Sequence, residues 1–538
     1  MKIRFLKYAL KIGFASMAWG AFSASASPFA PSPALSPEFN WKVTRQWSAA
    51  DEHKFSEFVA TMGASQCQSL TGCLTSATAN PFYAARTPKA KYPADCADLP
   101  FALRMYFSWM EELPFDYVNE VVAVKRIGSS GADIRYSKYG NRPVSRRSFQ
   151  PGTTYNFLRE YNDMRDSVST ATYRMHYKEI SDFYPPTIDR KGIRPGTVVY
   201  DPSGHAAIVW KIESDGRVRL MDAHPDNSVT RITFDQKFVR SRVEHGAGFK
   251  NWRPELNLAP TAQLPGFSTE QFNREFSIGG TRVSFYDYVR AEMAGGALRF
   301  DPLAEVKTMI SEICSNIHDR EVAVNAALSA GLNSNPHPDR LPKNIFGTSG
   351  EWEEYATPSR DARLKVAFAQ LRQESERYVT MYERGDSRIQ YQPAPSRHSG
   401  SCAPNDHVCF LAASMMSVYE EGVTADACHF TYMDSHGANR PLTYTDVVGR
   451  LFALSFDPYH CAELRWGEGN EGLRTCQDDR FKQQWYIAEQ GLRNQTERTY
   501  DVRMDYDVVG TAKELGVAHA PDVDLWGYLV NRVKAAAF

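Results

Sequence analysis

Beyond its first 26 residues, the 538-residue chain lacks any long uncharged apolar run, and it lacks an excess of either charge. A membrane-spanning helix needs about 20 consecutive apolar residues, so we expect a soluble protein with no transmembrane segment once the leader is removed. The 62 basic and 63 acidic residues give a formal net charge of −1. This balance argues against nucleic acid and against an anionic membrane surface as partners.

Motifs of several enzyme classes are missing as well. The chain has no H-E-x-x-H and no C-x-x-C, which are spacings typical of zinc sites. It has no G-x-S-x-G nucleophile turn and no Walker-type phosphate loop, so serine hydrolases and P-loop enzymes have little support. The length allows two or three domains, and 43% hydrophobic with 23% charged residues is ordinary for a globular protein.

The first residues have the pattern of a secretory signal peptide. A basic start precedes the apolar stretch 12–22 and Ala24-Ser25-Ala26, small residues that suit a cleavage site. The stretch is too short to span a bilayer, which argues against an uncleaved anchor. We therefore predict a signal peptide over residues 1–26 and a secreted or periplasmic protein of bacterial type. Residues 27–38, rich in Pro, Ser and Ala, predict a flexible N-terminal segment.

The nine cysteines indicate disulfides, because an exported protein folds in an oxidising compartment. An odd number leaves at least one thiol unpaired or paired between chains. In the first part of the chain Cys67 and Cys73 are near neighbours, which makes Cys96 the odd one. The alternative is that Cys96 pairs with one of them and is structural. If pairing stays within each part, the six cysteines of the second part pair among themselves: Cys314, Cys402, Cys409, Cys428, Cys461 and Cys476.

After Cys96 the sequence pattern is first helical and, about 100 residues further along the chain, strand-like. Residues 98–112 have helical spacing, and Pro100 is tolerated in a first helical turn. A helix carrying a cysteine, followed by an antiparallel sheet carrying a histidine, is an α+β arrangement. We assign residues 39–255 to this domain. Period-two patterns bounded by turn residues predict its strands at 197–200, 205–212, 217–222 and 229–234.

The remainder of the chain predicts a second, mainly helical region. Residues 256–268 contain prolines and polar residues and predict a linker. No motif indicates the role of residues 269–538. Helical spacing predicts helices in this region at 304–318, 360–383, 442–454 and 523–536.

Cys96 lies just before the helix 98–112, a position that favours reactivity. Unpaired N–H groups and the positive dipole end of a helix N-terminus favour a thiolate, while a free thiol has a pKa of about 8.5. Asp95 and Asp98 oppose this by like-charge repulsion unless they cap the helix. We predict that Cys96 is a nucleophile, and that its backbone N–H forms an oxyanion hole together with Tyr92.

The residue that would orient a catalytic histidine at the start of strand 205–212 depends on the hairpin register. A turn centred on Asp215-Gly216 sets the histidine opposite Asp226, and a turn centred on Glu213-Ser214 sets it opposite Asp222. Asp-Gly is the better two-residue turn. The spacing in the family named below favours Asp222. We predict Asp222, with His224 and Asp226 as alternatives.

His205 itself follows a glycine and precedes two alanines, which leave room for a substrate. Cysteine, histidine and an orienting residue in this chain order predict a thiol nucleophile with an imidazole base. His205, Asp222 and His224 would also suit zinc, but 19 residues separate the two histidines, and we predict no metal.

Three segments resemble bacterial cell-wall cysteine peptidases. Pro195-Gly196-Thr-Val-Val-Tyr200 and Gly204-His205-Ala-Ala-Ile-Val209 are similar to the PGD-strand and GHVAIV segments of NlpC-type endopeptidases and of cysteine/histidine-dependent amidohydrolase/peptidase domains. Asp95-Cys96-Ala97 is similar to their DCSG turn, although Ala-Asp follows the cysteine here in place of Ser-Gly. The cysteine and histidine are 109 residues apart, more than is typical of either group. The resemblance covers residues 90–255 and implies a papain-like fold, no cofactor, and cleavage or transfer of an acyl group at an amide.

The resemblance makes a peptide or amide bond in peptidoglycan the expected substrate. The long spacing makes a transglutaminase-like acyl transferase or protease, acting on protein, the second hypothesis. A third is a non-catalytic secreted binding protein on a degenerate papain-like fold, against which the intact Cys96 and His205 argue. The sequence does not indicate an oligomeric state.

Overall fold

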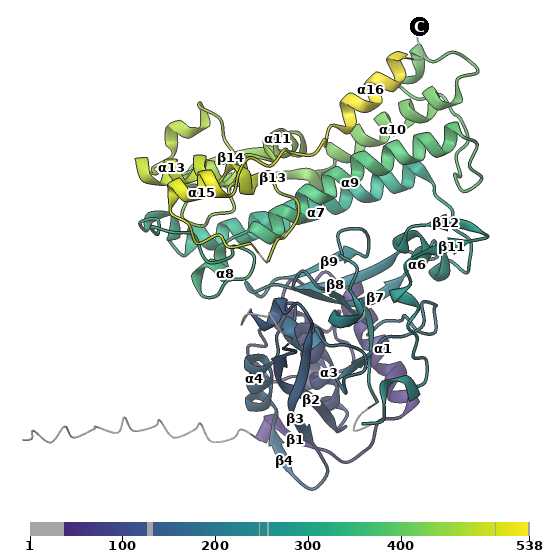
Figure 1. Ribbon diagram of the computed structural model, residues 1–538, viewed down its shortest axis with the longest axis vertical. Coiled ribbons are helices and arrows are strands. Elements are labelled where there is room, and N and C mark those ends of the chain that lie inside the picture. The colour runs from purple at the N-terminus through teal and green to yellow at the C-terminus, as the bar shows by residue number, and fades with distance from the viewer. Residues whose placement is uncertain (1–36, 126–132, 247, 255–257, 501, 536–538) are drawn as a thin grey trace, which may run out of the picture.

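A computed structural model describes residues 37–125, 133–246, 248–254, 258–500 and 502–535. Figure 1 shows a mixed α/β body that contains the N-terminal half and a mainly helical body stacked against it. This agrees with the predicted α+β class. The predicted signal peptide and most of the segment 27–38 lie outside the described residues. No helix within the described ranges is long and apolar enough to cross a membrane.

A six-stranded antiparallel sheet is the centre of the α/β body. Its strand order is β5-β10-β6-β7-β8-β9, so the hairpins that are consecutive in sequence are also neighbours in space. The four predicted strands are present, and no end differs from its prediction by more than one residue. The bounds are β5 Phe183–Tyr184, β6 Val198–Asp201, β7 His205–Ile212, β8 Val218–Ala223, β9 Val229–Thr233 and β10 Phe249–Trp252.

Side chains of this sheet alternate between two cores, as the pleat of a strand requires. On one face Ile208 and Met221 join an apolar cluster with Phe55 of α1 and Phe107 of α3. On the opposite face the neighbouring sheet residues join a cluster with α6. The helices concerned are α1 Ala49–Ala64, α3 Asp98–Met110 and α6 Phe285–Met293. Burial on both faces fixes the register of the strands, because a slip by one residue would exchange the two faces.

Smaller elements complete the α/β body around α3. Strands β2 and β3 form an antiparallel pair, as do β1 and β4. Helices α4 and α5 are separate because Ser169 caps the second of them. The bounds are β1 Asn40–Lys42, α2 Leu70–Thr75, β2 Phe115–Ala123, β3 Asn141–Phe149, β4 Thr154–Asn156, α4 Phe157–Ser167 and α5 Thr170–Tyr173.

The segment predicted as a linker, 256–268, packs against the sheet body where it is described. The Ser268 N–H donates to the Pro185 carbonyl at 3.0 Å. The Gln271 side chain then both accepts from and donates to the backbone of Phe249, as a neighbouring strand would. The hairpin β11 Phe276–Ile278 with β12 Thr281–Val283 and then α6 follow on the same side. The packing of the first body therefore extends well past the predicted boundary.

The helical body is built on a second apolar core shared by several helices and a hairpin. The predicted helix 442–454 begins as strand β14, and only its middle is helical, because Thr443 forms a capping box with Asp446. The main elements are α7 Pro302–Ser329, α9 Pro358–Glu383, α10 His407–Val423, β13 His429–Met433, β14 Asn439–Thr443, α11 Tyr444–Arg450 and α16 Leu525–Ala535. A smaller cluster lies beside it, with α8 Glu351–Tyr355, α13 Arg480–Ala488, α14 Gln490–Arg493 and α15 Val508–Glu514. Helix α12 Ala462–Arg465 contributes Ala462 to the larger core.

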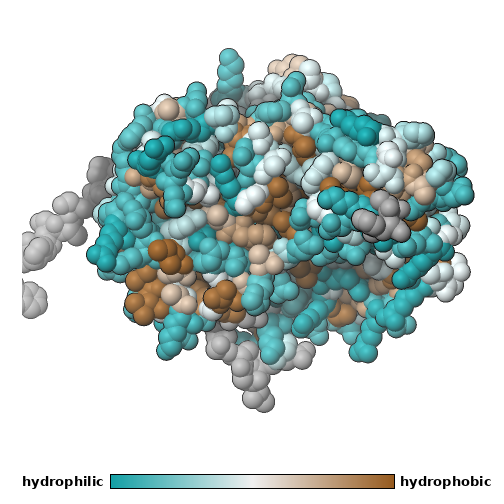
Figure 2. All heavy atoms as spheres, turned by 90° about the horizontal axis from the view of Figure 1, so that it is seen from above, coloured by the Kyte–Doolittle hydropathy of each residue, from teal (hydrophilic) through white to brown (hydrophobic). Residues whose placement is uncertain are grey.

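The face of the helical body that is seen from above is mainly polar (Figure 2). In the view from above, hydrophobic side chains form small patches separated by hydrophilic ones (Figure 2). Scattered apolar side chains of this kind are normal on a protein surface.

Candidate active site

Cys96 is held at the N-terminus of α3 by two aspartates that cap the helix. Oδ1 of Asp95 accepts hydrogen bonds from the amides of Ala97 and Asp98, each at 2.9 Å, and Oδ2 of Asp98 accepts from the Asp95 amide at 3.3 Å. This reciprocal arrangement is a capping box. It satisfies the helix amides that follow Cys96, while the Cys96 N–H itself has no acceptor among the described residues.

All nine cysteines lie in the described ranges, and eight of them form disulfides. The bonds are Cys67–Cys73, Cys314–Cys428, Cys402–Cys409 and Cys461–Cys476. Cys96 is the free cysteine. The predicted pairing within each part of the chain and the predicted odd cysteine are both confirmed.

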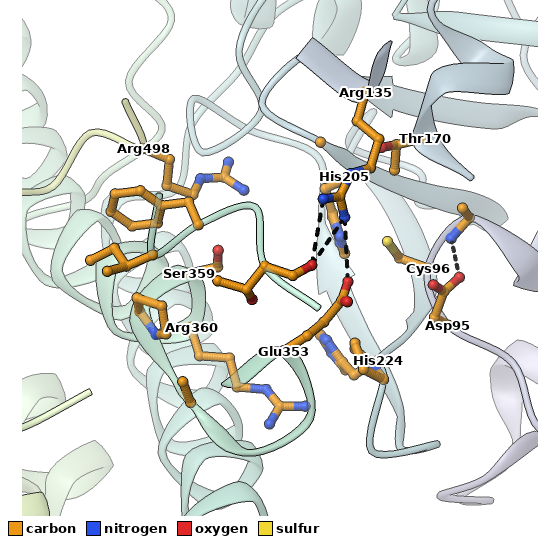
Figure 3. A pocket seen from close by; sticks show the side chains of 18 of the residues that line it. Asp95, Cys96, Arg135, Thr170, His205, His224, Glu353, Ser359, Arg360 and Arg498 are labelled. Atoms are coloured by element: carbon orange, nitrogen blue, oxygen red, sulfur yellow. Dashed lines mark hydrogen bonds and ion pairs between the residues drawn. The ribbon is translucent and has the colours of Figure 1, made fainter. Parts of the chain in front are cut away.

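The Cys96 sulfur points into a pocket and is only partly exposed (Figure 3). Burial raises the pKa of the thiol, and the negative charge of Asp95 raises it further, while the Ala206 N–H directed at the sulfur lowers it. The resting group is therefore a thiol, and nucleophilic attack needs a base. Burial and the charge of Asp95 thus oppose the effect of the helix N-terminus, which favours a thiolate.

His205 is bonded to the predicted orienting residue. Its Nε2 lies 2.7 Å from Oδ2 of Asp222, and the hydroxyl of Thr230 donates to the other carboxylate oxygen. Burial raises the pKa of Asp222, but the His224 and His205 imidazoles together with Thr230 hold it well below its usual value. An ionised carboxylate only accepts hydrogen bonds, so His205 carries its proton on Nε2 and has a lone pair on Nδ1.

The hairpin that brings His205 and Asp222 together follows neither predicted register. Ile208 lies opposite Met221, which sets His205 opposite His224 and diagonal to Asp222 when the pairing is continued. The turn places Gly216 in the left-handed region, at φ +85°, and β7 bulges at Trp210. Diagonal neighbours are within reach of long side chains, which explains how Asp222 contacts the imidazole without facing it.

Burial lowers the pKa of His205, and the hydrogen bond that His205 donates to Asp222 partly offsets this. The imidazole is therefore neutral at neutral pH and can accept a proton. No hydrogen bond joins Cys96 and His205 in the described chain; the two side chains border the same pocket. Bonds of this kind are often long in unliganded enzymes and shorten when substrate binds.

The two alternatives for the orienting residue have other partners. His224 Nε2 lies 3.1 Å from the Thr230 hydroxyl, and burial lowers the pKa of His224. Since the Thr230 hydroxyl donates to Asp222, it accepts from His224. Asp226 accepts from Ser228 and forms an ion pair with Arg360 at 2.7 Å, so it does not touch His205.

Tyr92 lies away from the pocket. It is fully buried, its hydroxyl donates to the Pro88 carbonyl at 2.9 Å, and its ring packs edge-on against Tyr161. This placement contradicts the predicted oxyanion role, because the hydroxyl is already bonded within the core. Thr170 borders the same pocket as Cys96, and its hydroxyl is a candidate second donor in place of Tyr92.

The pocket lies between the two bodies and has a volume of about 240 Å³. Figure 3 shows Arg498, Ser359 and Arg360 across the pocket from Cys96. Arg135 extends over it from the sheet body and donates to the Thr348 carbonyl at 3.4 Å. Sequence reasoning missed every residue that the helical body contributes, because no motif marks them and they are 140 or more residues away from His205 along the chain.

Ion pairs and a ring stack join the bodies around the pocket. Arg360 binds Asp226, and Arg498 binds Asp201 at 2.7 Å with both side chains nearly buried. The rings of Tyr136 and Tyr500 stack with centroids 3.8 Å apart. The helical body therefore forms one wall of the pocket, and the site depends on both halves of the chain.

Two groups in the described ranges bring three metal-binding side chains within 4.8 Å of one another, and both lie in the helical body. In one, Cys461 and Cys476 form a disulfide and offer no thiolate. The other is the buried set His337, Asp457 and Glu489. His205, Asp222 and His224 are not among these groups.

No protein-family model, curated protein or solved structure matches this chain.

Proposed function

We propose that this protein is a thiol-dependent amide hydrolase with Cys96 as nucleophile, His205 as base and Asp222 as the residue that orients the base. One observation carries the proposal. The free cysteine, at a helix N-terminus, borders the same pocket as a neutral imidazole whose far nitrogen is bonded to a buried carboxylate. A nucleophile, a base and an orienting group are the parts that covalent amide hydrolysis needs.

The proposed reaction has two halves. In the first, Sγ of Cys96 attacks the amide carbon while its proton moves to Nδ1 of His205. The C–N bond then breaks, the amine leaves with that proton, and a thioester remains on Cys96. In the second, water gives a proton to His205 and attacks the thioester, which releases a carboxylic acid and restores the thiol. Asp222 stabilises the imidazolium that forms in both halves.

The oxyanion of each tetrahedral intermediate needs hydrogen-bond donors. The Cys96 N–H is suited to this because it has no acceptor among the described residues and lies at a helix N-terminus, where the dipole favours negative charge. The Thr170 hydroxyl is the second donor in this proposal.

The helix that carries the cysteine packs on an antiparallel sheet that carries the histidine, which supports a papain-like arrangement of the site. The sequence resemblance to cell-wall cysteine peptidases makes a peptide bond of peptidoglycan the proposed substrate. Four disulfides fit an oxidising compartment outside the cytoplasm, so we also propose export.

Purified peptidoglycan incubated with the full chain tests this function. Wild type should release peptides, and Cys96→Ala and His205→Ala should each abolish the release. Amine adducts on glutamine-bearing proteins without release from peptidoglycan would replace the proposal with transglutaminase-like acyl transfer. Activity that survives Cys96→Ala but is lost to chelators would refute the thiol mechanism, and no activity on either substrate would favour a binding protein.

A further inference from the structure

Arg363 borders the pocket and has no partner of its own. It lies one turn into α9, the long helix whose N-terminal end forms part of the pocket wall. Among the described residues, none forms a hydrogen bond or an ion pair with its guanidinium group. The other pocket arginines are all engaged: Arg135 with Asp133, Arg360 with Asp226 and Arg498 with Asp201.

A partly buried guanidinium without hydrogen-bond acceptors lowers the stability of the folded protein. A guanidinium has five N–H donors, and leaving them without acceptors in a partly buried site costs free energy. Burial and the charge of Arg498 lower the pKa of Arg363 to about 10, so the group is still a cation at neutral pH. A ligand that supplies an anion would remove this cost.

The backbone of α9 adds donors at the same place. Thr357 makes no side-chain capping bond to the helix, and the amides of Ser359 and Arg360 have no acceptor in the described chain. The helix is 26 residues long, so the partial positive charge at its N-terminus is fully developed. Free amides at a helix N-terminus beside an unpaired arginine are a favourable site for an anion.

We propose that Arg363 and the first amides of α9 bind a carboxylate of the substrate, so that the enzyme acts on peptides with a free carboxylate close to the scissile amide. The proposal rests on the function proposed for Cys96, because it places the carboxylate across the same 240 Å³ pocket from the nucleophile. A guanidinium binds a carboxylate through two parallel hydrogen bonds, which also orients it.

Protection of Cys96 from alkylation tests the site without requiring turnover. The full chain is treated with iodoacetamide, a neutral reagent, in the presence of glutarate, its uncharged counterpart glutaramide, or inorganic phosphate. We expect glutarate to slow alkylation of Cys96 and glutaramide not to. In Arg363→Gln the glutarate concentration needed should rise about ten- to a hundredfold, as expected for loss of charge-assisted hydrogen bonds, and Arg363→Lys should keep part of the protection.

A matched control is available on the same helix. Arg372→Gln removes the same charge from a residue that pairs with Glu376 and stacks on Tyr528, outside the pocket, and should protect like wild type. Equal protection in Arg363→Gln and wild type, or none by glutarate in wild type, would overturn the proposal, as would protection by phosphate alone. Circular dichroism of Arg363→Gln and Arg363→Lys separates misfolding from lost binding.

Turnover separates this inference from the proposed function. If wild type cleaves soluble peptidoglycan peptides, amidation of their free carboxylates should lower kcat/KM in wild type and have little effect in Arg363→Gln. Cleavage that ignores amidation would overturn the carboxylate site and leave the thiol mechanism in place. Protection by glutarate without any cleavage of peptidoglycan peptides would support the carboxylate site and count against the proposed hydrolase function.

Discussion

Asp222→Asn is the substitution that isolates the charge behind the catalytic imidazole. Thr230 donates its hydroxyl to Oδ1 of Asp222, but a hydroxyl also accepts. The new amide NH₂ can therefore donate to Thr230 and leave its oxygen facing Nε2 of His205, which keeps the proton on Nε2. The substitution then removes a charge-assisted hydrogen bond without changing the tautomer.

A hydrogen bond to a charged group contributes about 1.5 to 3 kcal/mol, which corresponds to a fall in kcat of about ten- to a hundredfold. KM should change little, because the imidazolium exists only during the reaction. Asp222 raises the pKa of His205 against the effect of burial, so the acid limb of the pH–rate profile should move to lower pH in the variant.

The assay is release of peptide from peptidoglycan as a function of pH, with Asp226→Asn as the control. Asp226 bonds to Ser228 and Arg360 rather than to His205, so its substitution should leave kcat within a few-fold of wild type. A silent Asp222→Asn together with a damaging Asp226→Asn would refute this account of the site.

Three further predictions concern reactivity and stability. Alkylation of the unreduced protein should label Cys96 and no other cysteine; a second labelled cysteine by mass mapping would contradict the disulfide pattern. Burial raises the pKa of Asp226, but the charge of Arg360 and the other neighbouring groups outweigh it and bring the pKa from 3.8 to about 2. Asp226→Asn should therefore lower the free energy of unfolding in urea by about 2 kcal/mol at neutral pH. Wild type should lose the same free energy of unfolding as the pH falls from 4 to 2, since a carboxyl with a depressed pKa stabilises the fold only above that range. Arg360→Gln should lower the free energy of unfolding little further in the Asp226→Asn background. Additive losses from the two substitutions would contradict the pairing. Replacing Cys314 and Cys428 by serine opens a link across 114 residues and should lower stability by about 4 kcal/mol, measured in the same way; a loss below 1 kcal/mol would show that the disulfide contributes little.

Local patterns were sufficient for much of the α/β body. Short runs of apolar and β-branched residues between turn residues predicted β6 to β9, and both faces of this sheet are buried. The count and spacing of cysteines predicted the Cys67–Cys73 disulfide and the free Cys96. The contact between His205 and Asp222 was also predicted, although from family spacing and not from a correct register.

Features that depend on distant contacts were not predictable. The bulge at Trp210, which shifts the strand pairing by one residue, has no local signature. The observed partner of His205 lies two residues from each of the two predicted partners, so the predicted hairpin registers were wrong. Burial of Cys96 at the pocket, which raises the pKa of its thiol, could not be read from the sequence of the helix alone. The same holds for Arg363, whose role depends on a wall formed by a segment 267 residues after the nucleophile.

Hydroxylamine trapping tests the central claim, a thioester on Cys96, most directly. Hydroxylamine competes with water for an acyl-enzyme and gives a hydroxamate in place of the acid. Wild type incubated with peptidoglycan and hydroxylamine should release peptides that end in a hydroxamate, identified by mass, and Cys96→Ala should release none. Release of free acids alone at saturating hydroxylamine, with activity retained in Cys96→Ala, would contradict the account.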